Sequence, residues 1–113
     1  MIEAPVSGAF HTEYMRPALD RFEDVLSKID FSEPRIPIYS NVTGLPYESV
    51  DDMKSLLVRQ IVEPVLWRAT MLHLVAKGPG HVRFYEVGPG KQLKTMLSKV
   101  NRKLIRNIVN IEV

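Results

Sequence analysis

The chain of 113 residues contains no cysteine. This absence excludes disulfide bonds, thiolate metal sites and a cysteine nucleophile, and it fits a reducing compartment. No apolar run is long enough to cross a bilayer, and no basic segment followed by an apolar one opens the sequence, so we expect neither a membrane span nor a leader. The formal charge is only +2, which gives no general argument for nucleic acid as a partner.

The overall composition is typical of a globular protein, with 45% hydrophobic and 25% charged residues. The length suffices for one small domain or for part of a larger one. A chain of this size builds only a marginal core, because small domains bury a smaller fraction of their surface. We find no internal repeat and no low-complexity segment.

Apolar residues at steps of three and four predict amphipathic helices along much of the chain. The first helix is expected after Thr12 as its cap, with Pro17 near its start, and the second after a capping box at Ser49–Asp52. We expect Pro64 to open a third helix, which ends at Lys77–Gly80. The predicted apolar faces are Met15, Ala18, Leu19, Phe22, Val25, Leu26 and Ile29; Met53, Leu56, Leu57 and Ile61; Val65, Ala69, Leu72 and Ala76; and Leu93, Met96, Leu97 and Val100.

Short apolar runs between these helices predict strands at Ile36–Ser40, His81–Val87 and Ile105–Val113, with a turn at Asn41–Gly44. Helices that alternate with short apolar strands are typical of an α/β fold with a mostly parallel sheet. We therefore predict this class.

One histidine follows a small-residue turn in the run Pro5-Val6-Ser7-Gly8-Ala9-Phe10-His11-Thr12. An imidazole titrates near pH ~6.5 and can exchange protons with a substrate at neutral pH. A histidine at a loop edge is also common as a hydrogen-bonding surface or core residue, so the local pattern leaves both interpretations open.

The histidine run resembles a motif of the malonyl-CoA:acyl-carrier-protein transacylases, and further blocks follow in that family's order. These blocks are Asn41-Val42-Thr43-Gly44, then Leu57-Val58-Arg59-Gln60 leading into Pro64-Val65-Leu66-Trp67, and then Glu86-Val87-Gly88-Pro89-Gly90-Lys91. Each block is weak alone, and together they are specific. The resemblance implies that residues 1–113 are the C-terminal part of the large subdomain of an α/β-hydrolase-like acyltransferase core, with a short, mostly parallel sheet flanked by helices.

The resemblance also implies a chemistry, in which an activated serine takes malonyl from coenzyme A and passes it to the phosphopantetheine thiol of acyl carrier protein. His11 would be the general acid and base, and the backbone carbonyl of Gln60 would orient its ring. Malonyl-CoA and acyl carrier protein are the implied partners. No metal or cofactor is implied, since the coenzyme A thioester is a substrate. Fatty-acid biosynthesis of this kind is expected in the cytoplasm, or in an organelle's stroma or matrix.

Two further residues are candidates for substrate binding. The form Ala9-Phe10-His11 resembles the version of the motif that goes with malonyl selectivity, in which Phe10 would leave no room for an α-branch on the acyl group; the alternative is that Phe10 is a core residue. Asn41 is first of all a turn residue, and we expect it to line the site as a second role. We expect Trp67 to pack in the core. Gly88-Pro89-Gly90 lacks the spacing of a phosphate loop and is interpreted as a structural turn.

The sequence contains no Gly-x-Ser-x-Gly elbow around any of its serines. In the transacylases the serine motif, the oxyanion loop and the arginine that binds the malonyl carboxylate all lie upstream of the matched region. We therefore expect this chain to be inactive alone, and to associate with the missing N-terminal half or with a second copy of itself. The competing interpretation is a non-catalytic interaction domain derived from the same fold.

Basic residues concentrate near the end of the sequence, at Lys91, Lys94, Lys99, Arg102, Lys103 and Arg106. The simplest interpretation is a solvated helix face. A docking site for the acidic acyl carrier protein is the functional alternative. Nucleic acid is the third choice, because no recognition motif or interleaved aromatic residue accompanies these side chains.

Overall fold

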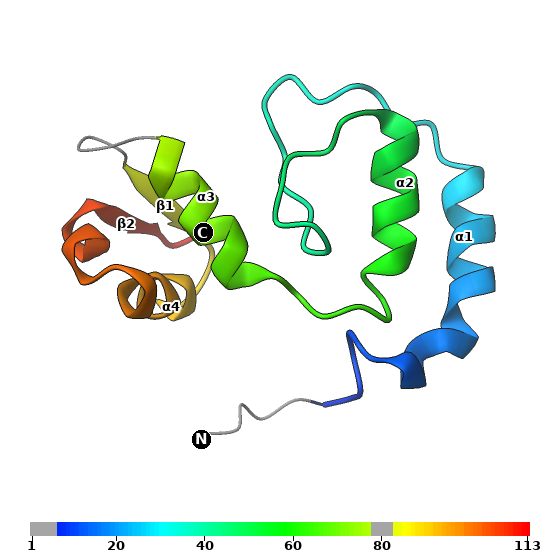
Figure 1. Cartoon of the computed structure of the whole chain (residues 1–113), viewed down its shortest axis with the longest axis horizontal. Coiled ribbons are helices and arrows are strands. Elements are labelled where there is room, and N and C mark those ends of the chain that lie inside the picture. The colour runs from blue at the N-terminus through cyan, green and yellow to red at the C-terminus, as the bar shows by residue number, and fades with distance from the viewer. Residues whose placement is uncertain (1–6, 78–82) are drawn as a thin grey trace. The chain divides into compact units, whose positions relative to one another are not determined.

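The computed structural model describes residues 7–77 and 83–113, without the side chains of residues 104 and 105. The chain divides into two compact units, Met1–Trp67 and Arg68–Val113 (Figure 1). The apolar run Pro5-Val6, the predicted helix stop at residues 78–80 and the start of the predicted strand at His81-Val82 lie outside the described residues. Within the described part of the chain, no helix has the length and apolar character that a membrane crossing requires.

The first predicted helix starts as a 3-10 helix, Glu13–Ala18, and continues as α1, Leu19–Ser27. In an α-helix the ring of Pro17 would clash with the carbonyl of Glu13, four residues earlier, which favours a different first segment. Thr12 is the N-cap residue, as predicted, but its hydroxyl donates to the carbonyl of Ala9 at 2.6 Å and binds no helical N–H. Of the predicted apolar face, only Leu26 is fully buried.

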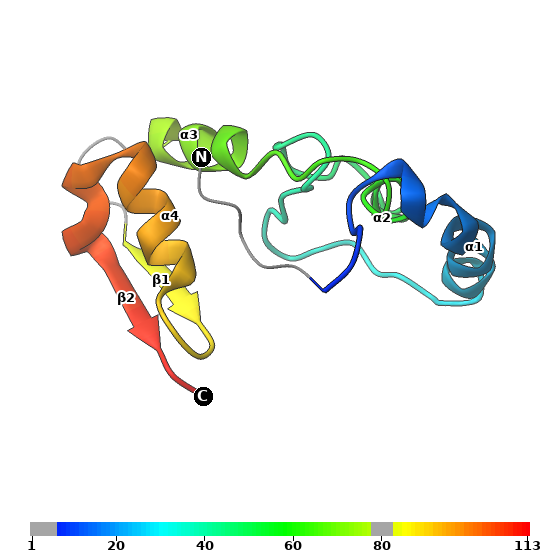
Figure 2. The same cartoon turned by 90° about the horizontal axis from the view of Figure 1, so that it is seen from below.

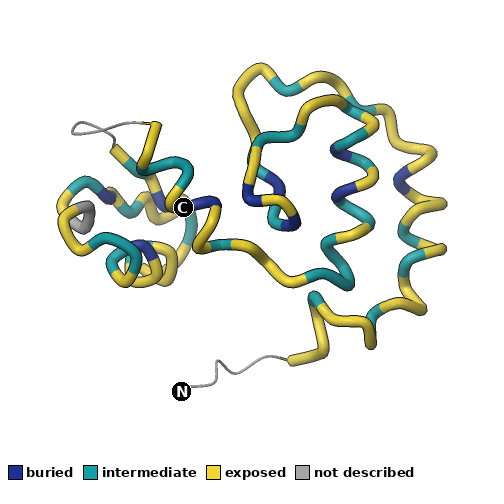
Figure 3. The backbone as a smooth tube through the Cα atoms, viewed as in Figure 1, coloured by how far each residue is buried: buried dark blue, intermediate teal, exposed yellow. Residues whose placement is uncertain are grey.

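Helix α2, Val50–Arg59, begins where the sequence predicts. The hydroxyl of Ser49 accepts from the N–H of Asp52 at 3.0 Å, and the carboxylate of Asp52 accepts from the N–H of Glu48 at 3.1 Å. The first bond satisfies an N–H group that a helix start otherwise leaves unpaired, and the second joins the residue before the cap to the first turn. Met53 and Leu56 are the buried residues of α2, and buried stretches are visible along this helix in Figure 3. Helix α2 also contacts α1. The helix ends at Arg59, before the predicted Ile61.

The predicted strand at Ile36–Ser40 is wrong, because only an isolated antiparallel bridge joins Tyr39 to Pro46. Pro37 and Pro46 lack the N–H groups that a longer ladder would need. The segment instead forms a tight hairpin-like loop, in which Ser40 N–H donates to the Leu45 carbonyl at 2.9 Å. The predicted turn is present, and Gly44 adopts the left-handed φ of 69° that glycine tolerates.

Helix α3, Trp67–Lys77, starts later than predicted, because the N–H of Leu66 is bound to the carbonyl of Asn41 at 2.8 Å and the segment from Pro64 stays non-helical. Its predicted buried face is also wrong. Thr70 and Met71 are buried, whereas the predicted residues Val65, Ala69, Leu72 and Ala76 are exposed. Trp67 is half-buried.

The second unit contains a parallel pair of strands, β1, Phe84–Val87, and β2, Ile108–Ile111, which point the same way in Figure 2. The register pairs Phe84 with Ile108 and Val87 with Ile111. Helix α4, Gln92–Val100, and a 3-10 helix, Arg102–Asn107, connect the strands, so the predicted α/β class with a short parallel sheet is confirmed. The last strand starts at residue 108 and not at 105, because the 3-10 helix, whose start is capped by the side chain of Asn101, extends to Asn107.

The carboxylate of Glu86 joins the sheet to α4. Glu86 is buried, and it accepts hydrogen bonds from the N–H groups of Leu93 at 2.8 Å and Lys94 at 3.1 Å. The amide of Asn110 donates to the Gly90 carbonyl at 2.6 Å and thereby holds the turn before the helix. These contacts agree with the structural interpretation of Gly88-Pro89-Gly90. Of the predicted α4 face, Leu97 is buried, while Leu93 and Met96 are exposed.

Candidate active site

The backbone of His11 has a φ of 61°, and His11 is the one non-glycine residue in the described ranges with a positive φ. A left-handed conformation at such a residue costs roughly 1–3 kcal/mol and persists only where neighbouring contacts enforce it. Here the N–H of His11 donates to the carbonyl of Ile61 at 3.0 Å. The histidine is therefore held from its backbone as well as from its ring.

The Nδ1 atom of His11 lies 2.6 Å from the backbone carbonyl of Gln60, a residue 49 positions away in the sequence. A carbonyl oxygen only accepts, so Nδ1 carries the proton and Nε2 of the neutral ring retains its lone pair. Nε2 has no hydrogen-bonding partner among the described residues. The ring is thus oriented as a proton acceptor with its reactive nitrogen unoccupied.

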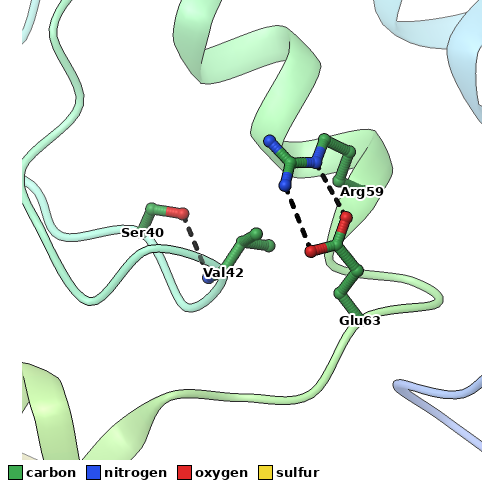
Figure 4. Close-up of polar contacts among 4 residues, drawn as sticks. All are labelled: Ser40, Val42, Arg59 and Glu63. Atoms are coloured by element: carbon green, nitrogen blue, oxygen red, sulfur yellow. Dashed lines mark hydrogen bonds and ion pairs between the residues drawn. The ribbon is translucent and has the colours of Figure 1, made fainter.

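The turn that supplies both carbonyls is fixed at the end of α2. Gln60 N–H continues the helical pattern by donating to the Leu56 carbonyl at 3.0 Å. Arg59 and Glu63 form a two-point ion pair, with Nε to Oε1 at 2.8 Å and a second guanidinium nitrogen to Oε2 at 3.2 Å (Figure 4). The hydrogen bond and the charge of Glu63 raise the pKa of Arg59 above its ordinary value. Gln60 and Ile61 therefore lie inside a closed loop.

A cavity of about 330 Å³ lies beside the imidazole; its lining residues are Phe10, His11, Met15, Ala18, Gln60 and Ile61. Phe10 is 56% exposed, so in this structure it is a wall of the cavity and not a core residue. Its ring lies over Gly8, where an added Cβ would approach Cε2 of Phe10 to 3.1 Å. An apolar wall beside a proton acceptor is suited to a small acyl group.

Three of the four site residues predicted from the sequence line the cavity, and one does not. His11, Gln60 and Phe10 meet around the cavity, but Asn41 does not line it. Instead, the side-chain amide of Asn41 donates to Oε1 of Gln60 at 3.3 Å. Sequence reasoning missed the Ile61 carbonyl, which has no side-chain signature. It also missed the pair of Arg59 and Glu63, although their spacing of four residues was a readable signal.

No serine lines the cavity among the residues that the structure describes. The basic group near the end of the sequence belongs to the second unit, where Lys91, Lys99, Arg102, Lys103 and Arg106 are exposed and Lys94 is half-buried. The site therefore offers an oriented base and an apolar wall, but no candidate nucleophile.

No protein-family model matches the chain. The chain is 39% identical over 111 residues to the mitochondrial malonyl-CoA-acyl carrier protein transacylase of Mus musculus, in an alignment that covers 96% of this chain and 29% of the relative. It is 37% identical over 103 residues to the malonyl CoA-acyl carrier protein transacylase of Bacillus subtilis, covering 91% of this chain and 32% of the relative. The chain thus spans about a third of the length of the curated relatives that it matches.

Solved structures give the same picture. The malonyl CoA-acyl carrier protein transacylase of Clostridium perfringens matches with a TM-score of 0.81 and 33% identity, over 99% of this chain and 34% of that structure. The corresponding protein of Coxiella burnetii matches with a TM-score of 0.86 and 28% identity, over 95% of this chain and 33% of that structure. Sequence and fold therefore point to the same group of proteins.

Proposed function

This chain belongs to the malonyl-CoA:acyl-carrier-protein transacylase family, of whose matched members it spans about a third, and from that premise we propose that it supplies the general acid and base for malonyl transfer. The observation that carries the proposal is the 2.6 Å contact between Nδ1 of His11 and the Gln60 carbonyl, which leaves Nε2 facing no described partner. A serine from outside this sequence would be the nucleophile.

The proposed reaction has two halves. Nε2 of His11 takes the proton of the serine hydroxyl while the serine oxygen attacks the malonyl thioester carbonyl. When the tetrahedral intermediate collapses, the carbon–sulfur bond breaks and the same proton passes to the departing thiolate of coenzyme A. In the second half, His11 takes the proton of the phosphopantetheine thiol while its sulfur attacks the carbonyl of the serine ester. The ester carbon–oxygen bond then breaks, and His11 returns the proton to the serine oxygen. Coenzyme A enters as part of the substrate and not as a resident cofactor.

The backbone carbonyl of Gln60 supports both halves. It keeps the proton on Nδ1 while the ring is neutral, and its partial negative charge stabilises the imidazolium that forms when Nε2 is protonated. A main-chain oxygen is suited to this role because no rotamer change removes it. We infer that Phe10 limits the space next to the reacting acyl group.

A base without a nucleophile cannot form an acyl intermediate, so we propose that the chain alone is inactive. The test compares the isolated chain with a chimaera in which the chain replaces the matching stretch of the Bacillus subtilis transacylase. We expect no malonyl transfer by the isolated chain and measurable transfer by the chimaera. His11→Gln in the chimaera should lower kcat by about 100-fold or more, whereas the exposed control Ser27→Ala should not. Turnover by the isolated chain would contradict the proposal.

We propose that the remainder of a transacylase fold covers the open face of the sheet. Tyr85, Val87, Val109 and Ile111 share that face through the register of β1 and β2, and all are exposed. Parallel sheets are ordinarily covered on both faces, so bare apolar residues there favour an occupant. Sedimentation of the chain with the remaining part of the Bacillus subtilis relative should give a complex. A chain that stays monomeric at micromolar concentration and does not bind this part would refute the proposed covering. A homodimer would indicate that a second copy of the chain covers the face.

Acyl carrier protein is the proposed acceptor, and the basic group of Lys91, Lys94, Lys99, Arg102, Lys103 and Arg106 is the proposed docking surface. An acidic partner would be steered there by complementary charge, so binding should weaken as salt increases. Salt-sensitive binding of the chain to acyl carrier protein, without binding to DNA, is the expected result. The alternative function is a non-catalytic interaction domain, which a folded chimaera insensitive to His11→Gln would favour. The cytoplasm or an organelle matrix stays the predicted location.

A further inference from the structure

We propose that Asn41 is a positioning residue, which fixes the imidazole of His11 by holding the side chain of Gln60, and that it does not bind the acyl substrate. The side-chain amide of Asn41 donates to Oε1 of Gln60 at 3.3 Å, and the main chain of Gln60 accepts from Nδ1 of His11 at 2.6 Å. Asn41 is absent from the lining of the cavity beside the ring. Its contact with the site therefore passes through Gln60.

The loop that carries Asn41 is rigid enough for such a role. Ser40 is 1% exposed, and its hydroxyl accepts from the N–H of Val42 at 3.1 Å (Figure 4). Ser40 N–H donates to the Leu45 carbonyl at 2.9 Å, and Gly44 N–H donates to the Ser40 carbonyl at 2.9 Å. These bonds fix the main chain on both sides of Asn41. A side chain on a fixed loop can restrain its partner, whereas one on a loose loop would only follow it.

The backbone of Asn41 ties the same loop to the segment after α2. The carbonyl of Asn41 accepts from the N–H of Leu66 at 2.8 Å, while its side chain contacts Gln60 before that segment. Asn41 therefore spans the stretch from Gln60 to Leu66 with two different groups. A substitution at position 41 that does not strain the loop keeps the backbone bond to Leu66. It therefore removes only the side-chain contact with Gln60.

Restraint at Gln60 matters because His11 is held in an unfavourable backbone conformation. Its φ of 61° is retained by two bonds, one to the carbonyl of Gln60 and one to the carbonyl of Ile61. Strained residues return to ordinary conformations when the contacts that determine them loosen. Removing the amide of Asn41 should let the peptide between Gln60 and Ile61, which carries the Gln60 carbonyl, tilt and weaken the bond to Nδ1 of His11.

The first test measures the tautomer of His11 in the full chain by long-range ¹H–¹⁵N NMR, with His11→Gln used to assign the signals. We expect Asn41→Ala to lower the ratio of the Nδ1–H to the Nε2–H tautomer by about two- to tenfold, as for one lost neutral hydrogen bond. Gln60→Met keeps the loop and the carbonyl but removes Oε1, so it should cause a similar shift, and the double variant should add nothing further. Thr43→Ala, which alters the same turn without touching Gln60, is the control and should leave the ratio unchanged.

An unchanged ratio in either folded single variant would overturn the proposal, as would additive shifts in the double variant. If Asn41→Ala fails to fold, Gln60→Met still decides, because it leaves the loop intact. The second test rests on the proposed function and uses the chimaera: Asn41→Ala should lower kcat and leave KM for malonyl-CoA within about twofold. A raised KM with unchanged kcat would instead assign Asn41 to substrate binding. A tautomer shift in a chain whose chimaera is inactive would refute the proposed function alone.

Discussion

Arg59 and Glu63 are joined by two hydrogen-bonded contacts that span the turn containing Gln60 and Ile61. The carbonyls of those two enclosed residues bind the ring and the backbone of His11. A surface ion pair is ordinarily worth little, but bidentate geometry restricts the orientation of both side chains. Here the pair restricts the peptide that orients a candidate base.

Glu63→Gln should loosen this turn and lower the pKa of Arg59 toward its ordinary value. Because the folded-state pKa of Arg59 is raised, its contribution is complete below the unfolded value and is lost only as pH rises past about 12. Arg59 stays charged at both pH values, so Glu63→Gln should lower the free energy of unfolding by the same amount at about pH 7 and about pH 9. Because salt screens exposed charges, the difference in unfolding free energy between Glu63→Gln and the unchanged chain should decrease at high ionic strength.

Urea unfolding at low and high salt measures this effect, and Asp24→Asn is the matched control. Asp24 in α1 and Lys28 just after its end form an exposed pair with the same four-residue spacing, at 2.6 Å. Both variants should respond to salt, but only Glu63→Gln should change the tautomer ratio of His11. A change of equal size in both variants would show that the Arg59 pair has no special connection to the site.

Two substitutions at Gln60 separate its main chain from its side chain. Gln60→Ala keeps the carbonyl that binds His11, so we expect malonyl transfer by the chimaera to fall by less than about tenfold. Gln60→Pro removes the N–H that donates to Leu56 at 3.0 Å and disfavours the helical conformation of Arg59, so it should lower activity by about 100-fold or more. Equal and severe losses in both variants would contradict a main-chain role for Gln60.

The sequence predicted local features of this fold better than the faces that its helices bury. The capping box at Ser49–Asp52 and the buried positions Met53 and Leu56 follow from spacing within a single helix. The buried face of α3 could not be obtained in this way. Leu72 fits the apolar stripe but is 42% exposed, because periodicity identifies an apolar face and not whether anything packs on it.

Local sequence patterns also fail to predict the contacts of the candidate site, because these contacts join residues far apart in the sequence. Contact between His11 and the Gln60 carbonyl joins residues 49 positions apart, and no local pattern predicts it; only the family resemblance suggested it. The resemblance also placed Asn41 near the site, although its side chain contacts Gln60 and not the cavity. The type of a residue cannot show that its main-chain carbonyl has a special role, as that of Ile61 has here, because every residue has such a carbonyl.

Glu86 should be a stability residue of the second unit. Glu86→Ala leaves the N–H groups of Leu93 and Lys94 without their acceptor and should lower the free energy of unfolding by about 2 kcal/mol. Glu86→Gln retains one acceptor oxygen but loses the charge at the start of α4, which should cost about 1 kcal/mol. Urea unfolding followed by circular dichroism measures both, with the exposed Glu112→Ala as control. Equal effects of Glu86→Ala and the control would contradict this role.

Phe10 is the residue at which acyl selectivity is most directly testable. Its ring is a wall of the cavity beside His11, so Phe10→Ser should open space where an α-methyl group would lie. One methyl group in an apolar pocket changes selectivity by roughly 10–200-fold, which bounds the expected effect. We expect the preference of the chimaera for malonyl-CoA over methylmalonyl-CoA, measured as the ratio of the two kcat/KM values, to fall by about tenfold.

Tyr14→Ser is the matched control for Phe10→Ser, because Tyr14 is 86% exposed, lies close in sequence and does not line the cavity. The two variants remove comparable aromatic surface, but only Phe10→Ser changes the space beside the imidazole. The ratio should fall because kcat/KM for methylmalonyl-CoA rises, since the substitution removes a steric obstacle. A ratio that falls only through slower malonyl transfer would indicate that Phe10 positions His11, and an unchanged ratio would remove Phe10 from the determinants of selectivity.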